Sequence, residues 1–509
     1  MKQMTKLSAI LLVALMVTSA SLIGQTDVRK PHRSKPNIVY IYADDLGYGE
    51  LGAYGQQKIK TPNLDRMARE GVRFDQHYSG APVCAPARAM LMTGKHGGHS
   101  YIRGNYELGG FSDDMEAGQM PLPEGTFTIA RMLKKAGYAT GMIGKWGLGM
   151  ADTPGSPLRQ GFDYYYSVLD QKQAHNFYPT HLWENDKWDK LDNPVIDVHK
   201  RLDRTKATDA DFLYFKGKVY GPDKMTEKAL NFIDKHQRQP FFLYLPYPLP
   251  HASLQAPDEY VNKYIGQFNE EPYYGQQNYA STRYPLSTYA AMITYLDAQV
   301  GLIMQRVKSL GLDENTIIMF SSDNGATFNT GGVDARFFKS VGNFRGLKMD
   351  LYEGGIRIPF LARWKGTIRP NRTSDLISAQ YDLMATLAEL TGQTIPNPTD
   401  GISFLPELKG YASRQVKHKY LYFEYPEKGG QVAIRMGDWK GVRVDVRKNP
   451  NAAWQIFNLK TDISETTDVA PQHPDLVKRF DQIQKDEHQP THIRDWEFIN
   501  PKFNVPKDQ

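Results

Sequence analysis

Three short runs of consecutive apolar residues predict buried strands. The runs are Ile38–Tyr42, Phe241–Leu245 and Thr316–Phe320, and they are rich in aromatic and β-branched residues. An uninterrupted apolar run of this length is typical of a strand that is covered on both faces. Between the runs, apolar residues recur every three or four positions, which predicts helices. The longest predicted helix is Ser287–Leu310, and Gly311 ends it.

Strands that alternate with helices predict an α/β fold in which a large mixed, mostly parallel sheet is sandwiched by helices. One of the shorter helices is predicted over Thr126–Ala136. After about residue 400 the pattern changes to short strands separated by turns, and a closing helix follows over Asp475–Lys485. We therefore expect a main α/β domain over residues 36–400. A smaller C-terminal α+β subdomain, built on an antiparallel sheet, is expected over residues 401–509.

The N-terminus has the pattern of a signal peptide. Lys2 and Lys6 precede the apolar run Leu7–Val17, and small residues follow it at Ser19–Ser21. A positive flank, a short apolar core and a small-residue exit are the parts of such a peptide. We expect residues 1–24 to be removed and the mature protein to be exported, either to the periplasm or out of the cell. No cysteine near the cleavage point offers a lipid anchor, and no later segment is apolar for long enough to span a membrane.

Composition and charge narrow the class of protein. The chain has 509 residues, of which 40% are hydrophobic, so a large core is expected. Its formal net charge is +6, but the charged residues are dispersed, and we expect no nucleic-acid partner. The single cysteine, Cys84, excludes an internal disulfide bond. A lone thiol in an exported protein is either buried and inert or present for chemistry.

Polar residues follow each of the three predicted strands. Asp44 and Asp45 come after the first, His251 after the second, and Asp323 and Asn324 after the third. Because ligands of an α/β fold gather at the carboxyl ends of its parallel strands, we expect these groups at one edge of the sheet. Adjacent buried carboxylates need a cation, and ligands that offer only oxygen favour Ca²⁺, with Mg²⁺ second, over Zn²⁺. Taken alone, the aspartate pair would indicate a helix cap or a solvated turn, and its position after a strand favours the metal site instead.

Cys84 is predicted to lie at the N-terminus of a helix. Pro86 suits the first turn of that helix, and Gly94 suits its end. The free N–H groups and the dipole of a helix N-terminus favour an anion. Arg88 lies one turn further on the same face, so its guanidinium can reach the same anion. The pattern indicates a site for a tetrahedral oxyanion beside residue 84.

The order of these motifs resembles the sulfatase family, whose formylglycine-dependent members belong to the alkaline phosphatase superfamily. The signature is Cys84-x-Pro86-x-Arg88, with Met92-Thr93-Gly94 after it. The resemblance runs from Asn37 to about Val469 and is to exported bacterial glycan sulfatases and arylsulfatases. The other segments that carry it are Asp44–Gly49, Thr61–Asp65, Gly144–Gly149, Pro250-His251, Ser322–Gly325, Arg345–Lys348, Glu353–Pro359 and Asp400-Gly401.

This resemblance implies a sulfuric ester hydrolase whose main domain is catalytic. A separate maturation enzyme would oxidise Cys84 to formylglycine, whose hydrated gem-diol attacks sulfur and later expels sulfate. The residues implied as ligands of Ca²⁺ are Asp44, Asp45, Cys84, Asp323 and Asn324. Three cations would neutralise the sulfuryl oxygens, and a histidine would protonate the leaving alcohol. These residues are Arg88, Lys145, Lys348 and His251.

One position departs from the family pattern. Many members of the family have a histidine where this chain has Gly147. That histidine is usually placed to help the gem-diol lose a proton. The identity of the base is therefore open between His175 and Asp323.

The aromatic-rich stretch from Tyr164 to Trp183 is a candidate sugar-binding cleft, with ordinary loop packing as the alternative. Its loop His175–Thr180 resembles that of glycan sulfatases that act on galactose-type sugars. His175 and Asn176 are therefore candidate substrate residues, and galactose or N-acetylgalactosamine 4-O-sulfate is a candidate substrate. Two other interpretations stay open. One is a phosphonate or phosphodiester hydrolase of the same superfamily, and the other is a non-catalytic glycan-binding protein of the same fold.

Overall fold

An eleven-stranded sheet forms the centre of the part of the chain that the computed structural model describes, residues 35–396 and 398–500. The strands lie in the order β12-β2-β11-β10-β1-β9-β5-β6-β7-β8, and β13 also pairs with β2. The five neighbours from β10 to β6 are parallel, whereas β11, β7 and β8 run antiparallel to their neighbours. This confirms the predicted mixed, mostly parallel sheet. The predicted signal peptide, residues 1–24, lies outside the described residues.

The strands of this sheet are β1 (Asn37–Ala43), β2 (Val72–Tyr78), β5 (Ala139–Lys145), β6 (Tyr164–Val168), β7 (His181–Glu184), β8 (Lys187–Lys190), β9 (Phe241–Pro246), β10 (Thr316–Ser322), β11 (Arg357–Arg363), β12 (Arg372–Ser374) and β13 (Ser378–Ala379). A separate two-stranded ribbon consists of β3 (Phe111–Ser112) and β4 (Met115–Glu116).

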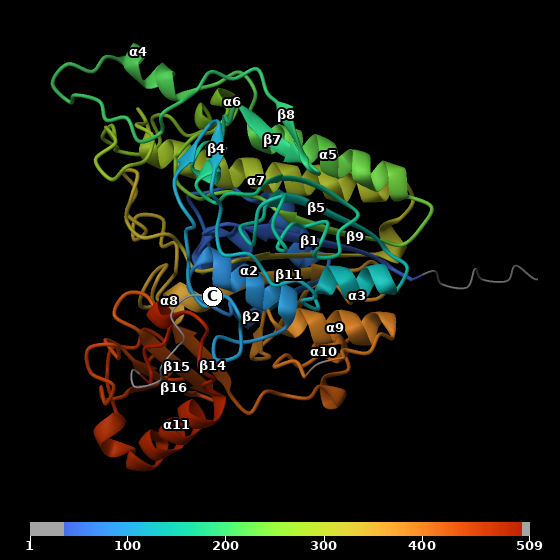
Figure 1. Cartoon of the computed structure of the whole chain (residues 1–509), viewed down its shortest axis with the longest axis vertical. Coiled ribbons are helices and arrows are strands. Elements are labelled where there is room, and N and C mark those ends of the chain that lie inside the picture. Colours follow the sequence, from blue (N-terminus) through green and yellow to red (C-terminus); the bar gives the residue numbers. More distant parts are fainter. Residues whose placement is uncertain (1–34, 397, 501–509) are drawn as a thin grey trace, which may run out of the picture. The chain divides into compact units, whose positions relative to one another are not determined.

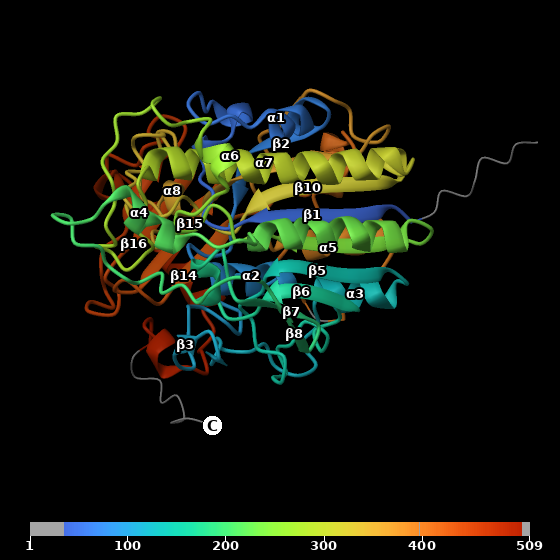
Figure 2. The ribbon, with the colours of Figure 1, turned by 90° about the horizontal axis from the view of Figure 1, so that it is seen from above.

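Helices cover both faces of the sheet (Figure 1). Alternate side chains of β1 point to opposite faces. Val39 and Ile41 join one core with α1, α5 and α7, while Tyr40 and Tyr42 join another with α2, α3 and α9. Figure 2 shows α5 and α7 lying along β1 and β10 on the first of these faces. The helices are α1 (Pro62–Arg69), α2 (Cys84–Thr93), α3 (Ile129–Lys135), α4 (Asp209–Phe212), α5 (Gly221–His236), α6 (Asp258–Val261), α7 (Pro285–Ser309), α8 (Glu353–Ile356), α9 (Asp382–Thr391) and α10 (Leu405–Leu408).

The predicted helix at Thr126 begins three residues later than its sequence pattern indicated. The side chain of Thr128 accepts a hydrogen bond from the backbone N–H of Arg131, which is the contact of an N-cap residue. Thr126 instead closes a turn in which its N–H donates to the carbonyl of Pro123. Helix α3 therefore starts at Ile129, because the second of two threonines takes the capping position.

A four-stranded antiparallel sheet forms the C-terminal part, as predicted. Its strands, in the order β14-β15-β16-β17, are β14 (Leu421–Tyr425), β15 (Gln431–Met436), β16 (Trp439–Arg443) and β17 (Gln455–Asn458). Phe423 and its neighbours on one face pack against residues next to the main sheet, such as Ile356. Tyr422 on the other face packs with Phe480 of α11 (Pro474–Glu487). The small sheet is thus covered on both faces.

Candidate active site

The carboxyl ends of β1 and β10 bring three carboxylates together. The two strands pair in register as far as Ala43 and Ser322, so the residues after them meet. The backbone N–H of Asp45 donates to Oδ1 of Asp323 at 3.0 Å, and Nδ2 of Asn324 donates to Oδ1 of Asp45 at 2.7 Å. These side chains and that of Asp44 are fully buried. The predicted cluster at one edge of the sheet is therefore present.

Cys84 is the first residue of α2 and lies beside this cluster. Its Sγ is 3.2 Å from Oδ1 of Asp44, and the residue is 2% exposed. Gly94 ends the helix in a left-handed conformation with φ of 67°, as the sequence predicted. Burial and the carboxylate of Asp44 raise the pKa of the Cys84 thiol well above its ordinary value. As encoded, the thiol stays protonated and is a poor nucleophile.

Three buried cations face the three carboxylates. Nη2 of Arg88 is 2.9 Å from Oδ2 of Asp323. Nζ of Lys145 is 2.7 Å from Oδ2 of Asp44, and Nζ of Lys348 is 2.8 Å from Oδ2 of Asp45. The three negative charges and the three positive charges balance, as a buried cluster of charges requires. Lys145 is the last residue of β5, whereas Lys348 lies in the loop before α8.

The carboxylates remain crowded in spite of these cations. Burial and the nearby Asp44 raise the pKa of Asp323 to about 7, although Arg88 opposes the rise. Burial would also raise the pKa of Asp44, but Lys145 and its other cationic neighbours hold it well below its usual range. Oδ1 of Asn324 is buried and has no hydrogen-bond partner among the described residues. Crowded carboxylates and an unpartnered amide oxygen fit a hard divalent cation with oxygen ligands.

His251 lies at the same edge, after β9, in contact with Lys348. Its Nε2 is 3.1 Å from Nζ of Lys348 and 3.5 Å from Oδ2 of Asp45, and its Nδ1 donates to the carbonyl of Ala252. Burial and Lys348 lower the pKa of His251 to about 4. The imidazole is therefore neutral at neutral pH, and Lys348 holds the proton between the two side chains.

The two candidate substrate residues differ in their surroundings. The ring of His175 stacks on that of His251, with centroids 5.1 Å apart, and its Nδ1 is buried without a partner among the described residues. The side chain of Asn176 instead bonds within its own turn, accepting from the backbone N–H of Tyr178 at 3.0 Å. The structure therefore brings His175 into the candidate site and leaves Asn176 at its margin.

Several residues at this site carry no motif that could have revealed them. The ring of Tyr279 lies 5.4 Å from that of His175 and 6.3 Å from that of His251. Asn105 accepts a hydrogen bond from the backbone N–H of Ala85, directly after residue 84, at 3.2 Å. Both residues lie in loops, so their place at the site depends on the fold and could not be predicted from the sequence. The C-terminal part also reaches the site, since Glu427 accepts from the backbone N–H of Asn105 at 2.6 Å.

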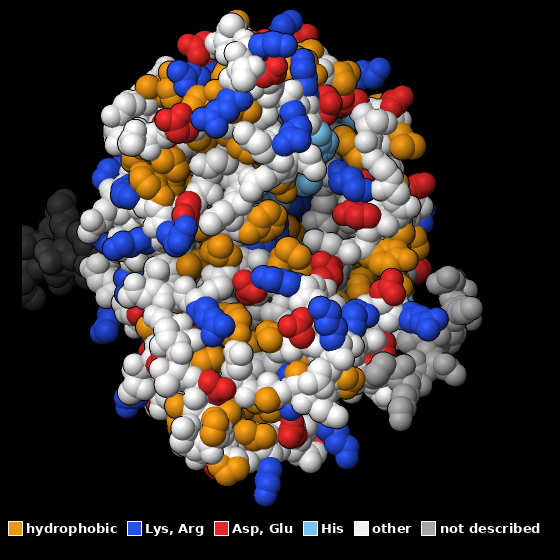
Figure 3. Space-filling view, turned by 90° about the vertical axis from the view of Figure 1, so that its left-hand side faces the viewer, with side chains coloured by type: hydrophobic (Ala, Val, Ile, Leu, Met, Phe, Trp, Pro, Cys, Tyr) orange, Lys and Arg blue, Asp and Glu red, His pale blue; other side chains and the backbone are white. Residues whose placement is uncertain are grey.

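A cavity of about 290 Å³ lies next to His175. Asn176, Lys172 and His199 are among its lining residues, and the ring of His199 is 6.3 Å from that of His175. Figure 3 shows a hollow in one face of the molecule, with histidine side chains in pale blue at its rim. The lining of this cavity offers polar groups to a ligand.

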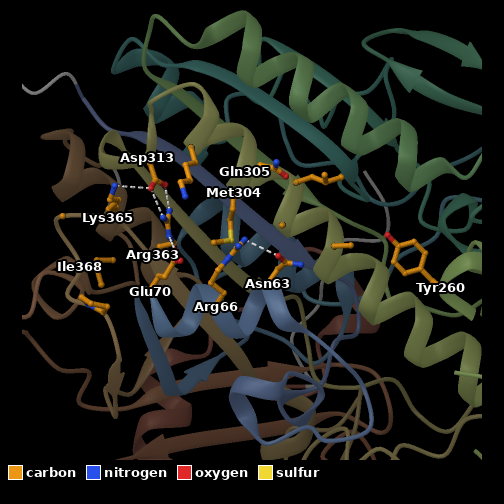
Figure 4. Close-up of a pocket in the computed structure, with 16 residues that line it drawn as sticks. Asn63, Arg66, Glu70, Tyr260, Met304, Gln305, Asp313, Arg363, Lys365 and Ile368 are labelled. Carbon is orange, nitrogen blue, oxygen red and sulfur yellow. Dashed lines mark hydrogen bonds and ion pairs between the residues drawn. The ribbon is translucent and has the colours of Figure 1, made fainter. Parts of the chain in front are cut away.

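A second groove, of about 960 Å³, lies at the opposite edge of the sheet (Figure 4). Asp313 lines it and precedes β10, whereas Asp323 follows the carboxyl end of β10. A seven-residue strand spans about 23 Å, so the two sites are separate. Arg363 in the groove is paired with Glu70 and Asp313, so these charges satisfy one another. The groove has no part in the chemistry of the buried cluster.

Comparison with known proteins agrees with this architecture. The family model described as Sulfatase matches residues 36–393. A second model, described as N-sulphoglucosamine sulphohydrolase, C-terminal, matches residues 346–489. The chain therefore belongs to the sulfatase family, and it is an enzyme that hydrolyses sulfate esters.

Similar proteins include enzymes of animals and bacteria. The N-acetylgalactosamine-6-O-sulfatase of Bacteroides thetaiotaomicron is 29% identical, over 95% of this chain and 99% of that protein. Arylsulfatase A of Homo sapiens is 32% identical, over 80% of this chain and 74% of that protein. The crystal structure of Ps i-CgsB in complex with k-i-k-neocarrahexaose has a TM-score of 0.71 and 28% identity, covering 90% of this chain and 94% of that one. In the described part of this chain, none of the helices has the length and apolar character that crossing a bilayer requires.

Proposed function

We propose that this enzyme releases inorganic sulfate from a sulfated carbohydrate, using formylglycine made from Cys84 together with Ca²⁺. The observation that carries the proposal is the position of Cys84 at the start of α2, among three carboxylates and three cations. Its raised pKa argues against the thiol itself as nucleophile, so oxidation to an aldehyde that hydrates gives residue 84 a chemistry the thiol lacks. A separate maturation enzyme is then a required partner.

The proposed Ca²⁺ is held by oxygen atoms at the ends of β1 and β10. The unpartnered Oδ1 of Asn324 and the crowding of the aspartates support this assignment. When bound, the ion supplies positive charge that favours an ionised oxygen on residue 84 and on the sulfuryl group. Its proposed ligands are Asp44, Asp45, Asp323, Asn324 and residue 84.

The cationic side chains then become available to the substrate. Lys145 and Lys348 each pair with an aspartate in the present structure, and a divalent cation would compete for those aspartates. The freed ammonium groups, with Arg88, can neutralise oxygens of the transferring sulfuryl group. A hydroxyl of residue 84 that has given its proton to a base, either His175 or Asp323, bonds to sulfur while the bond from sulfur to the alcohol oxygen breaks. We propose that His251, protonated at Nε2 when the anionic ester is bound, delivers that proton to the leaving oxygen.

A galactose-type sugar is the proposed substrate class. His175 stacks on His251, and the next residue, Asn176, lines a cavity together with His199, so the proposed sugar ring extends from its sulfate along this loop. The sequence of the loop favours sulfate at O4. The relative from Bacteroides thetaiotaomicron is named for O6 of N-acetylgalactosamine, so O6 is the second candidate position.

Mass spectrometry of the peptide that contains residue 84 tests the maturation step. The protein is expressed, with its signal peptide, in a host that matures cysteine-type sulfatases. Formylglycine at position 84 is the expected result. Unmodified cysteine in an enzyme that nevertheless turns over would contradict the proposal.

A panel of sulfated monosaccharides tests the reaction. We expect sulfate release from galactose or N-acetylgalactosamine sulfates, and the 4-sulfate and 6-sulfate forms decide the position. Turnover of a phosphodiester in preference to every sulfate ester would favour a phosphonate or phosphodiester hydrolase instead. Binding of a sulfated glycan without release of sulfate would favour a glycan-binding protein. Export to the periplasm or beyond is part of the proposal, and fractionation of the expressing cells checks it.

A further inference from the structure

Nε2 of Gln171, in the loop after β6, is a buried donor without a partner among the described residues. The residue is 7% exposed, and no atom among the described residues accepts a hydrogen bond from its Nε2. A buried donor left without an acceptor destabilises the folded protein. Native structures retain such a group where it has a role that the protein alone does not complete, such as contact with a ligand.

Gln171 belongs to the wall of the site that carries Lys145. The parallel ladder of β5 and β6 ends at Lys145 and Val168, and the backbone N–H of Gly147 then donates to the carbonyl of Leu169 at 3.2 Å. Gln171 follows two residues later. A Cβ atom on Gly147 would lie 2.7 Å from Cγ of Gln171 and 3.2 Å from its Nε2. The amide thus occupies the space in front of Gly147. Gly147 lies two residues after Lys145, which contacts Asp44.

The same loop leads from Gln171 to a histidine of the site. Gln171 lies four residues before His175, which ends the 3-10 turn Gln173–His175 and stacks its ring on that of His251. The backbone of the loop is fixed, because the N–H of Gln171 donates to Oε1 of Gln119 at 2.9 Å. The backbone of Gln171 is therefore fixed in the loop that leads from the end of β6 to the turn carrying His175.

We propose that Nε2 of Gln171 donates a hydrogen bond to an oxygen of the sulfuryl group of the bound ester. This rests on the proposed sulfate-ester substrate, and it makes Gln171 a substrate-contacting residue. Gly147 is then required in order to leave room for the amide. A neutral donor adds no charge to a wall that already holds Lys145, and the sulfuryl oxygen supplies the acceptor that the described residues lack.

Binding of inorganic sulfate to the mature, calcium-loaded enzyme tests the proposal independently of turnover. Gln171→Glu keeps the size of the side chain but replaces the donor with an anion. We expect it to weaken sulfate binding by more than Gln171→Ala, for which about 10- to 100-fold is expected from one hydrogen bond to a charged acceptor. The loss of kcat/KM should follow the same order. If Gln171 only fills space, Gln171→Glu binds sulfate like the wild type and Gln171→Ala merely lowers Tm, which would overturn the proposal.

A matched control is available in Gln160. It is also a fully buried glutamine, but its Nε2 is already bonded to the carbonyls of Pro123 and Pro154. Gln160→Ala should lower Tm and leave sulfate binding unchanged. An equal loss of sulfate affinity in this variant would show that general loosening, and not the donor of Gln171, explains the effect.

A double-mutant cycle between Gly147 and Gln171 provides a second measurement. Gly147→Ala introduces the Cβ that meets Gln171, and its φ of +74° adds strain. We expect it to weaken sulfate binding in the wild type and to have little further effect beside Gln171→Ala. Strictly additive losses would contradict the proposed contact. A wild type that binds sulfate yet hydrolyses no sulfate ester would refute the proposed function, whereas an active wild type with a silent Gln171→Glu refutes only this inference.

Discussion

At the scale of single residues, the candidate active site is a balance of carboxylates and cations. The strand pattern located the carboxylates, because polar residues directly after apolar strands lie at the sheet edge, and the helix pattern located Arg88. Only the family resemblance indicated Lys145 and Lys348. Tyr279 and Gln171 carried no signal at all, since their role depends on how two loops fold against the ends of strands. The protonation of His251 was equally inaccessible, because Lys348 and burial determine it.

His251 is expected to matter most for poor leaving groups. In His251→Gln, hydrolysis of an alkyl sulfate such as a sugar sulfate should fall by about 10²- to 10⁴-fold, the usual contribution of a general acid. Sulfates of acidic phenols should lose much less, because their leaving oxygen needs no proton. Plotting kcat/KM against the pKa of the leaving alcohol gives the measurement. His181→Gln is the control, since His181 bonds to Glu116 outside the site and its plot should keep the wild-type slope.

Asn324 is expected to contribute directly to the affinity for Ca²⁺. Asn324→Leu keeps the approximate volume but removes the oxygen that lacks a partner, so Ca²⁺ affinity should fall at least about tenfold, as the loss of even outer-shell partners does. Titration calorimetry on protein treated with EGTA measures this. In Asn324→Asp, which keeps an oxygen at the position, binding should be better than in the leucine variant. Equal affinities in all three proteins would exclude Asn324 as a ligand.

At the scale of elements, the alternation of apolar runs and helical patterns was enough to predict the layers. The ends of elements were harder to predict, as α3 shows. Two threonines of the sequence suit its N-cap position, and it is the second, Thr128, that accepts the hydrogen bond from the N–H of Arg131. Contacts between elements were not predictable. An example is Lys440 of β16, which is fully buried and pairs with Glu353 of α8 at 2.9 Å and with Glu465 at 3.1 Å. These three side chains join the small sheet to the main part of the described chain.

Removing Lys440 should destabilise the protein strongly. The cationic Lys440 and Arg357 outweigh burial and lower the pKa of Glu353 to about 2, so the carboxylate stays charged. In Lys440→Met the free energy of unfolding should fall by about 3 kcal/mol, because the buried Glu353 and Glu465 lose the cation that they share and only Glu353 keeps another, Arg357. Denaturant titration measures the change. Lys428→Met is the control, since Lys428 is half exposed in its pair with Asp350, and about 1 kcal/mol or less is expected there.

At the scale of the whole molecule, the far end of the chain is tied back to the small sheet through a histidine. His488 follows α11, and its two ring nitrogens contact Glu424 of β14 at 2.9 Å and Glu497 at 3.1 Å. Burial would lower the pKa of His488, but the hydrogen bonds to Glu424 and Glu497 outweigh it and raise the pKa to about 9. The sequence pattern predicted the helix but not these contacts of His488, which join the end of α11 to β14 and to the segment around Glu497.

The contacts of His488 make the free energy of unfolding depend on pH in the alkaline range. Because the pKa of His488 is higher in the folded state than its ordinary value near 6.5, its stabilising contribution is complete below about pH 6.5 and disappears as the pH rises through about 9. The contribution is at most about 3 kcal/mol. Thermal unfolding of the wild type and of His488→Gln measures it. The difference in Tm should be large at pH 6 and small at pH 10, and a difference that is constant with pH would contradict this assignment.

The burial of Cys84 has a consequence for the order in which oxidation of this residue and folding of the chain take place. At 2% exposure, the thiol is out of reach of any second protein once α2 has packed against β1 and β10. Oxidation by a separate enzyme, as proposed, must therefore happen while this stretch is still an open chain. Maturation then competes with folding, and a molecule that folds first keeps its cysteine permanently. Slowing the folding of the nascent chain, rather than adding more maturation enzyme after it has folded, is what should raise the fraction of active molecules.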